Sequence, residues 1–406
     1  MRDKKEDKEP DQNDEVPEEE TLEADAVHPE SGVFSKARPL GRTFASFYHR
    51  DFSLLWVGSL LSNIGTWIQI TAVNWVVFLL TKPNSALPLG AVNFLNSFPV
   101  FLFVLYAGSL ADRVSRRRIL LITQTALLIF ALALGILTTV SRLTLFWIYF
   151  LTFATGVGTA FTFPTWQAII PDLVPRRNLM NAIALNSAQF NGARMVGPAI
   201  AGVVLAAFGA ATNFYANAVS FLAVIVALLL IRPRPVVTRS TEGGWAHLTE
   251  GIRYSRIHWS IGLLLIYIGI LSVFGLSYIV LLPIFAGEIL KSGAQAYGFL
   301  AAAAGLGSVA GALTVASIAH MANRSLLVKW TVAAAGGFLI LFALSSNLYL
   351  SLVLLVGVGF AFLASTSMIN TIIQESVPNV IRGRVMSIYI WMFLGLQPFG
   401  SLAYGA

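Results

Sequence analysis

Long apolar stretches separated by short polar breaks run through the chain from residue 52 onward. Each stretch is long enough for a helix to cross about 30 Å of hydrocarbon at ~1.5 Å per residue. The pattern predicts an all-α membrane protein with eleven spans, near residues 53–80, 87–111, 119–140, 145–170, 179–208, 213–231, 260–286, 295–319, 326–345, 349–373 and 384–406.

The composition supports a multi-span membrane protein and excludes several kinds of chemistry. The 406 residues are 56% hydrophobic with a mean hydropathy of +0.73, and 12% are charged, against about 25% in a soluble domain. There is no cysteine, which excludes disulfides, thiolate nucleophiles and cysteine-ligated metals. The opening MRDKKEDKEP lacks the pattern of a cleaved signal peptide, so we expect the first span to direct insertion.

The net charge of +7 is unevenly distributed along the chain, with an acidic N-terminal segment and a basic remainder. Residues 1–30 hold 4 Lys/Arg and 13 Asp/Glu, whereas the remainder holds 23 and 7. Residues 1–46 are acidic and nearly free of aromatics, a composition that cannot bury enough apolar surface to fold alone. We expect a disordered acidic cytoplasmic leader there, and a solvated tail is favoured over a partner-binding segment.

The basic residues indicate the orientation of the spans. If the N-terminus is cytoplasmic, inside segments hold 19 Lys/Arg, and outside loops hold only Lys82, Arg142 and Lys291. This bias follows the positive-inside rule. It also explains the pI of about 9.7 better than nucleic-acid binding, because the surplus lies in short loops rather than on one patch.

A repeat divides the bundle in two. The longest internal loop, 232–259, follows the sixth span, and IIPDLVP at 169–175 recurs as IIQESVP at 372–378, an offset of 203. The pattern predicts an N-terminal six-helix half (47–231), a cytoplasmic linker and a C-terminal half (260–406), with a substrate site near the midplane between them. The offset places the end of a complete second half near 434, so we expect a twelfth span to be missing, as a fragment or by loss.

The segment GSLADRVSRRR, residues 108–118, lies between the second and third spans. Its order of Gly108, Leu110, Ala111, Asp112 and Arg113, followed by arginines 116–118, resembles the loop-2/3 signature of the major facilitator superfamily. Ser115 stands where the signature has a second glycine, and the second-half counterpart at 311–324 is degenerate, with His320 in place of an acid. The resemblance covers about residues 47–406 and implies the major facilitator fold of two six-helix halves.

The same resemblance implies a conformational latch. In this superfamily the loop-2/3 carboxylate is thought to hold the start of the eleventh span, which here begins Gly383-Arg384. The implied contact is from Asp112 to that helix N-terminus. The alternative is that Asp112 merely offsets its basic neighbours. The residues expected to form the latch are Gly108, Asp112, Arg113, Arg116, Arg117, Asp172 and Arg384.

The run DFSLLWVGSLLSNIGTWIQITAVNWVVFLLT (51–81), taken with LADRVSRRR and NGARMVGPAIAG, resembles the enterobactin-exporter-like and multidrug-efflux branch of the superfamily. The resemblance implies outward transport of a small molecule, with protons as the coupling ion. It does not identify the substrate.

The fifth span carries small residues in a regular pattern. Gly192, Gly197-Pro198 and Gly202 resemble the family's fifth-span antiporter signature, although the Ala201-Gly202 pair departs from its usual ending. The eighth span offers Gly307 and Gly311 at the same spacing of four. Two such faces can pack backbone to backbone. We expect them to seal the interface between the halves; ordinary close packing is the alternative.

Arg194 lies in the middle third of the fifth span, where an arginine costs ~2.5–3.5 kcal/mol. Three interpretations compete: a structural clamp on helix-end carbonyls, a receptor for an anionic substrate, or a modulator of a proton site. Outside the leader, every carboxylate falls near a span end or in a loop, and Thr152 stands where relatives often carry a fourth-span arginine. The expected proton-coupling pair is therefore missing. A planar guanidinium suits carboxylate or catecholate groups, which points to an anionic or siderophore-like cargo.

Helical spacing adds polar and aromatic candidates for the substrate cavity, although helix packing explains each of them as well. The histidines show no metal-ligand spacing, and no phosphate-binding glycine loop is present. We therefore expect no cofactor, no metal and no ATP drive. With Arg194, the cavity candidates are Asn63, Trp67, Asn74, Tyr267, Tyr278 and Asn370.

Together these features predict a transporter rather than an enzyme. The leading hypothesis is secondary active export of a small amphipathic or anionic molecule by alternating access, as a proton antiporter. It would act as a monomer in a bacterial-type plasma (inner) membrane, with the N-terminus cytoplasmic. The alternatives are an uptake or facilitated-diffusion permease and a non-transporting membrane scaffold or sensor.

Overall fold

The computed structural model describes residues 44–232, 252–318 and 324–406. The described part holds eleven helical segments long and apolar enough to cross a membrane. This confirms the eleven spans predicted from the sequence. Most of the acidic leader and of the 232–259 linker lies outside the described residues.

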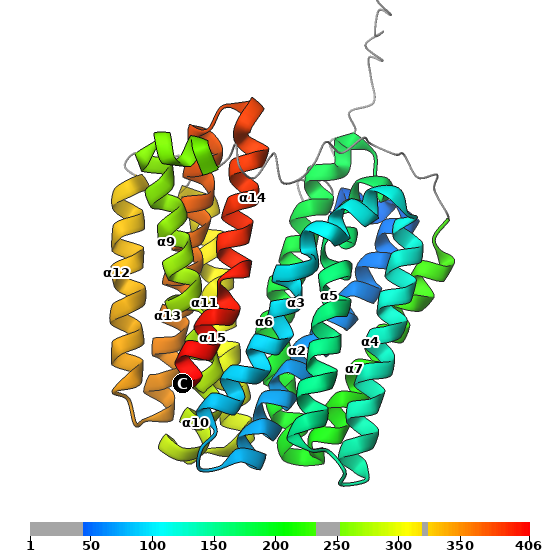
Figure 1. The fold of residues 1–406 in the computed structure, drawn as a ribbon, viewed down its shortest axis with the longest axis vertical. Helices are drawn as coiled ribbons and strands as arrows, with labels where there is room; N and C mark the ends of the chain where they lie inside the picture. The colour runs from blue at the N-terminus through cyan, green and yellow to red at the C-terminus, as the bar shows by residue number, and fades with distance from the viewer. Residues whose placement is uncertain (1–43, 233–251, 319–323) are drawn as a thin grey trace, which may run out of the picture. The chain divides into compact units, whose positions relative to one another are not determined.

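The first six spans are long α-helices, with one short turn of 3-10 helix before the first and another before the fifth (Figure 1). Gly209 ends the fifth of them with φ +79° and ψ 176°, a conformation that essentially only glycine adopts, and the next helix begins one residue later. The elements are η1 (Ala45–Tyr48), α2 (Arg50–Thr81), α3 (Ala86–Arg113), α4 (Arg116–Thr139), α5 (Leu145–Leu173), η2 (Arg176–Asn178), α6 (Leu179–Phe208) and α7 (Ala210–Leu230).

The seventh and eleventh spans are interrupted near their middles, which the sequence pattern did not predict. Pro398 lacks the N–H that would continue the eleventh span. Ser272 Oγ donates to the Phe393 carbonyl at 2.6 Å and Tyr404 donates to the Phe274 carbonyl at 3.0 Å, so each span bonds to a carbonyl beside the other's break. The elements are α9 (Trp259–Gly275), η3 (Ser277–Leu281), α10 (Leu282–Ile284), η4 (Phe285–Ile289), α11 (Gly293–Ile318), α12 (Arg324–Ala343), α13 (Leu348–Ser376), α14 (Asn379–Gly395) and α15 (Gln397–Gly405).

The two halves show the same ion pair at repeat-related positions. Arg116, at the start of α4, pairs with Asp172 near the end of α5 at 2.6 Å. Arg324, at the start of α12, pairs with Glu375 near the end of α13. Asp172 and Glu375 are the acids of the IIPDLVP and IIQESVP repeats, 203 residues apart. The repeated sequence therefore has the same local structure in both halves.

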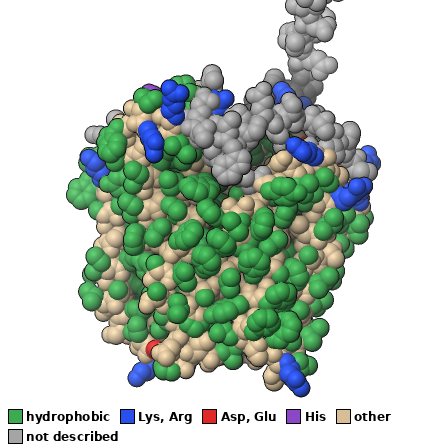
Figure 2. Space-filling view, viewed as in Figure 1, with side chains coloured by type: hydrophobic (Ala, Val, Ile, Leu, Met, Phe, Trp, Pro, Cys, Tyr) green, Lys and Arg blue, Asp and Glu red, His purple; other side chains and the backbone are tan. Residues whose placement is uncertain are grey.

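The Lys and Arg residues are distributed unevenly between the two ends of the helices. We call one the basic end, because it carries nearly all the Lys and Arg of the described residues, and the other the opposite end, which carries Lys82, Arg142 and Lys291. In Figure 2 most of the visible Lys and Arg side chains lie along the upper edge and a few at the lower edge, with apolar side chains covering the middle. The basic end holds Arg50, Arg113, Arg116, Arg117, Arg118, Arg176, Arg177, Arg232, Arg253, Arg256, Arg324, Lys329, Arg382 and Arg384.

The halves pack against each other through α6 with α11 and α3 with α15. Close backbone contacts lie toward the opposite end: a Cβ on Gly202 would stand 2.9 Å from Gly298 Cα, and one on Gly90 would stand 3.0 Å from Gly405 Cα. Trp75 stacks on Tyr297 across the same interface, with ring centroids 6.0 Å apart. The helices therefore meet closely where they approach the opposite end.

Candidate functional site

Arg194 lies in the middle of α6, half-buried. Its guanidinium carbon stands 5.8 Å from the centroid of the Trp67 ring on α2. Gly197, one turn further along α6, permits this approach, because a Cβ there would stand 2.5 Å from Trp67 Cβ. The pairing of Arg194 with an aromatic face is a cation–π contact, worth about 0.5–2 kcal/mol.

No carboxylate of the described residues lies within ion-pair distance of Arg194. Tyr278, on η3 of the other half, is near enough for an electrostatic interaction with it. The Asp and Glu residues of the described part lie at or near helix ends or, like Glu288, in the short η4 helix. A cation in the middle of the bundle, over an aromatic ring and without a carboxylate partner among the described residues, is suited to receive an anion.

Asn63 belongs to a small hydrogen-bonded group one turn from Trp67 on α2. Its Nδ2 donates to Ser59 Oγ at 3.3 Å, and Gln189 Nε2 of α6 donates to the same hydroxyl oxygen. This group joins α2 to α6 beside Arg194 and fixes the spacing of the two helices there.

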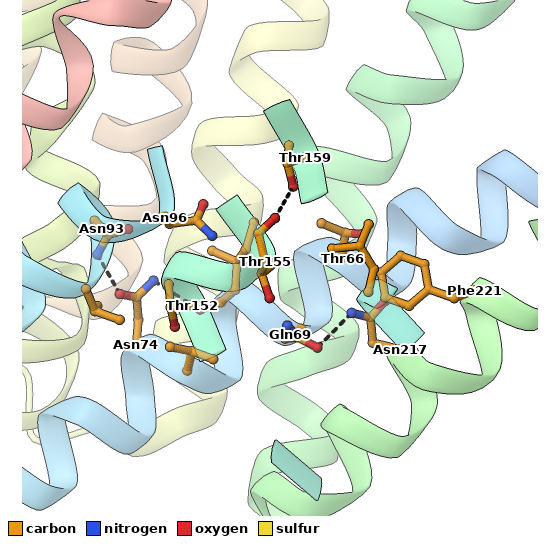
Figure 3. Close-up of a pocket in the computed structure, with 14 residues that line it drawn as sticks. Thr66, Gln69, Asn74, Asn93, Asn96, Thr152, Thr155, Thr159, Asn217 and Phe221 are labelled. Atoms are coloured by element: carbon orange, nitrogen blue, oxygen red, sulfur yellow. Dashed lines mark hydrogen bonds between the residues drawn. The ribbon is translucent and has the colours of Figure 1, made fainter. Parts of the chain in front are cut away.

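A polar cavity of about 120 Å³ lies within the N-terminal half, among α2, α3, α4, α5 and α7. Figure 3 shows Thr152 and Thr155 of α5 between a group of three asparagines and the Gln69–Asn217 pair. We call this cavity the amide pocket. Its lining residues are Thr66, Gln69, Ile70, Val73, Asn74, Val92, Asn93, Asn96, Leu127, Thr152, Thr155, Thr159, Asn217 and Phe221.

Two hydrogen-bonded pairs of amides border the pocket. Asn93 Nδ2 donates to Asn74 Oδ1 at 2.7 Å, and Asn217 Nδ2 donates to Gln69 Oε1 at 2.8 Å. Thr155 Oγ1 is buried and has no hydrogen-bond partner. A buried polar group without a partner costs about 1–3 kcal/mol, so the pocket offers unused hydrogen-bonding capacity.

The structure brings some of the predicted cavity residues together and leaves others apart. Arg194 lies over the Trp67 ring, Tyr278 is within range of an electrostatic interaction with Arg194, and Asn74 lines the amide pocket. Asn370 accepts a hydrogen bond from Gln374 on its own helix at 2.6 Å. Tyr267 is 43% exposed on α9. Neither of these two lines the amide pocket.

The basic residues expected in the latch hold helices within one half. Arg116 bonds to Asp172 and to the Ala168 carbonyl, both on α5. Arg117 donates to the carbonyls of Leu228 and Leu229 at 2.6 and 3.0 Å, which caps the C-terminus of α7. These contacts fix the geometry of the basic end on the N-terminal side.

The two glycines expected in the latch have free space around them in the described structure. A Cβ added to Gly108 or to Gly383 would meet nothing within 4 Å. Arg113 is exposed. The side chain of Asp112 lies outside what the structure describes. The contact between Asp112 and the eleventh span stays a prediction.

The glycines of the eighth span pack differently from the expected arrangement. Gly307 and Gly311 face α13, against the carbonyls of Val356 and Phe360, rather than α6. The glycines of α11 that lie against α6 are Gly298 and Gly305, seven residues apart and therefore on one helix face. Gly307 and Gly311 lie on another face, which accounts for their different partner.

The small residues predicted on α6 contact different helices. Gly197 faces Trp67 of α2, Gly202 faces Gly298 of α11, and the Pro198 carbonyl also lies against Gly298. Gly192 differs, since a Cβ there would meet nothing within 4 Å.

The amide pocket is the part of the site that the sequence interpretation missed. Asn93 and Asn96 stand three residues apart on α3, and Thr152, Thr155 and Thr159 recur at spacings of three and four on α5. Such spacing places each set on one helix face. Polar residues on one face of an apolar span were the available signal.

Eleven spans, two repeat-related halves and a site in the middle of the bundle define a transporter of the major facilitator type. The family of transmembrane secretion effectors matches residues 41–406. The chain belongs to this family. It is not an enzyme family, and the chain is a siderophore-exporter-like member of the superfamily.

Two curated relatives are similar over most of their length. The chain is 29% identical to the staphyloferrin A transporter of Staphylococcus aureus over 355 residues, which cover 85% of this chain and 86% of the relative. It is 27% identical to the enterobactin exporter EntS of Escherichia coli over 343 residues, which cover 84% and 81%.

Solved structures share the fold at low identity. A bacterial homologue of the iron transporter ferroportin, in an inward-facing state, superposes with a TM-score of 0.67 at 14% identity, covering 88% of this chain and 91% of the other. A bacterial homologue of the lysosomal transporter Spinster, also inward-facing, gives 0.66 at 16% identity, covering 87% and 81%. These likenesses show the major facilitator fold of the described helices.

Proposed function

We propose that the protein exports a small anionic molecule, of carboxylate or catecholate siderophore type, across a bacterial-type plasma membrane. The observation that carries this proposal is Arg194, a cation in the middle of the bundle with no carboxylate partner among the described residues and with Trp67 beneath it. The names of the relatives, a staphyloferrin A transporter and an enterobactin exporter, support a siderophore-like cargo.

The export direction is proposed from the name of one relative, the enterobactin exporter EntS, and the orientation of the helices is compatible with it. The concentration of Lys and Arg at the basic end supports a cytoplasmic location for that end and for the N-terminus. The close contacts at Gly202–Gly298 and Gly90–Gly405 then lie on the outer side of the membrane. This arrangement is closed outward and suited to receive cargo from the cytoplasm.

Alternating access completes the cycle. Rocking of one half against the other would separate α6 from α11 at the opposite end and bring the basic ends of α3 and α14 together. Asp112 would then reach the start of α14 at Arg384, with Gly108 and Gly383 allowing close approach. The leader (1–46) and the linker (232–259) are the cytoplasmic segments of this proposed monomer.

We propose proton antiport as the driving mechanism, following the family resemblance. A second candidate, facilitated diffusion, is favoured by one observation: the carboxylates of the described part lie near helix ends or in the η4 turn rather than beside Arg194. In proton antiport an imposed proton gradient drives accumulation of the cargo, whereas in facilitated diffusion the gradient causes no accumulation.

The test uses inside-out vesicles and 2,3-dihydroxybenzoate, a small catechol carboxylate, as the probe. Wild-type protein is expected to accumulate the probe when the lumen is acidic, and a protonophore is expected to abolish the accumulation. Accumulation that a protonophore leaves unchanged removes the antiport proposal. Arg194→Lys and Arg194→Gln variants with full uptake and normal expression would remove the anion-site proposal.

A further inference from the structure

We propose that the amide pocket is a second subsite for the same cargo, which takes a neutral amide or hydroxyl group while the anionic group lies at Arg194. This inference rests on the proposed function and deepens it by naming the cargo class. The cargo would carry a carboxylate or catecholate joined to an uncharged hydrogen-bonding segment, such as a secondary amide.

The chemistry of the lining selects a neutral polar group. The polar residues of the pocket are asparagine, glutamine and threonine, and none of its lining residues is charged. Amides and hydroxyls both donate and accept hydrogen bonds. An amide in the cargo has the same double character, whereas an isolated charge there would find no counter-charge among the lining residues.

The pocket has hydrogen-bonding capacity that the protein does not use. Thr155 Oγ1 is buried without a partner among the described residues, and Asn96, Thr66 and Thr152 line the pocket around it. Asn96 and Thr155 both line the pocket, and Figure 3 shows them on neighbouring helices. By contrast, Asn74 and Asn217 are held in pairs with Asn93 and Gln69. The paired residues form a fixed wall, and the unpartnered Thr155 hydroxyl is available to a ligand.

The pocket is large enough for one part of a cargo molecule but too small for the complete molecule. Its volume of about 120 Å³ equals that of roughly four water molecules. Sites that enclose a complete drug-sized ligand are about 300–1,000 Å³. A peptide-like unit with an adjoining methylene can enter, and the remainder of the cargo must lie outside.

The position of the pocket places that remainder beside Arg194. Trp67 lies against the Arg194 guanidinium, and Ile70 and Asn74, which line the pocket, follow it by three and seven residues on α2. That spacing places all three on one face of the helix. Thr159, on the rim of the pocket, is exposed. A molecule with its anionic group on Arg194 can therefore extend into the pocket.

Both subsites belong mainly to the N-terminal half. Arg194 lies on α6, Trp67 on α2 and the pocket among α2 to α7, while Tyr278 comes from the other half. The cargo would stay with the N-terminal half as the halves rock, and Tyr278 would close on it from the C-terminal half.

The experiment measures binding to purified wild-type protein and variants in lipid nanodiscs with two probes. One is 2,3-dihydroxybenzoylglycine, which has a catechol, an amide and a carboxylate. The other is 4-(2,3-dihydroxyphenyl)butanoate, in which methylenes replace the amide. Thr155→Val removes an unpartnered hydroxyl at nearly constant shape, and Asn96→Ala removes the neighbouring amide. Thr331→Val on α12, whose hydroxyl bonds only within its own helix, is the matched control.

Thr155→Val and Asn96→Ala are each expected to raise the Kd of the amide probe by about threefold to tenfold, as the loss of one neutral hydrogen bond implies. The Kd of the butanoate is expected to stay unchanged, and Thr331→Val is expected to change neither. If both probes weaken equally, or if neither changes, the subsite is overturned.

Arg194→Gln separates this inference from the proposed function. It is expected to weaken both probes by a similar factor, because both carry the carboxylate. If it changes neither probe while Thr155→Val still weakens the amide probe alone, the anion site fails and the amide subsite stands. If Arg194→Gln weakens binding of both probes and Thr155→Val weakens binding of neither, the anion site stands and the amide subsite fails.

Discussion

The Gly202–Gly298 contact between α6 and α11 gives a steric prediction about access to the site. A Cβ on Gly298 would stand 2.5 Å from the Pro198 carbonyl oxygen, 2.7 Å from Gly202 Cα and 2.9 Å from Gly202 N. All three atoms are backbone, so no side chain can rotate away. Carbon atoms prefer separations of about 3.5–4.0 Å, so Gly298→Ala must move the helices apart by roughly 1 Å.

Overpacking of this kind costs about 1–3 kcal/mol. If the cost falls only on the state closed at the opposite end, the population of that state relative to the alternative drops by about 5- to 150-fold. The expected result for Gly298→Ala is a shift toward the outward-open state and slower transport.

The absence of cysteine from the sequence makes this shift directly measurable. Thr66→Cys places a single thiol in the amide pocket, and a membrane-impermeant maleimide is added outside right-side-out vesicles. Gly298→Ala is expected to speed labelling at least fivefold. Gly336→Ala on α12 is the control, because a Cβ there meets nothing within 4 Å. Labelling at the same rate in both variants, with normal expression, would refute the steric argument.

Three further predictions concern stability and recognition. Gly209→Ala forces a side chain into the φ +79° conformation and is expected to lower stability by about 1–3 kcal/mol, seen as a lower melting temperature in detergent, while Gly336→Ala leaves the melting temperature unchanged. Arg324→Gln removes a partly exposed ion pair with Glu375 and is expected to cost no more than about 1 kcal/mol; a much larger loss would show that the pair has a greater role than its exposure implies. Trp67→Leu removes the ring beneath Arg194 and is expected to weaken binding of the anionic probe modestly, by less than Arg194→Gln does, in a fluorescence-independent binding assay.

The spans and the charge pattern were predictable because each depends on local composition. An apolar stretch of sufficient length crosses a membrane whatever its neighbours are. The repeat was equally informative: aligning IIPDLVP with IIQESVP places Asp172 on Glu375, and both pair with an arginine at the start of a neighbouring helix.

The helix breaks and the glycine partners were not predictable from local sequence. The spacing of Gly307 and Gly311 indicates close approach by some helix but does not say which one, and α13 rather than α6 is the answer. The interruption at Leu276 depends on a neighbouring span, whose Tyr404 bonds to the Phe274 carbonyl. Both features are set by tertiary packing.

The amide pocket was missed for a related reason. Asn96, Thr155 and Asn217 lie in three different apolar spans, and helix packing explains the polar residues of each span taken alone. Five helices bring them together. Arg194 was identifiable, in contrast, because a charge in the middle of a span is costly wherever its partners lie.

The central claim is that Arg194 receives the anionic group of the cargo. The most direct measurement compares the Kd of 2,3-dihydroxybenzoate with that of its uncharged counterpart 2,3-dihydroxybenzamide, for wild-type protein, Arg194→Lys and Arg194→Gln in nanodiscs. A charge-assisted contact is worth about 1.5–3 kcal/mol, so wild-type protein is predicted to prefer the acid by at least tenfold. The preference should shrink in Arg194→Lys and vanish in Arg194→Gln. An equal preference for the acid in all three proteins would contradict the claim.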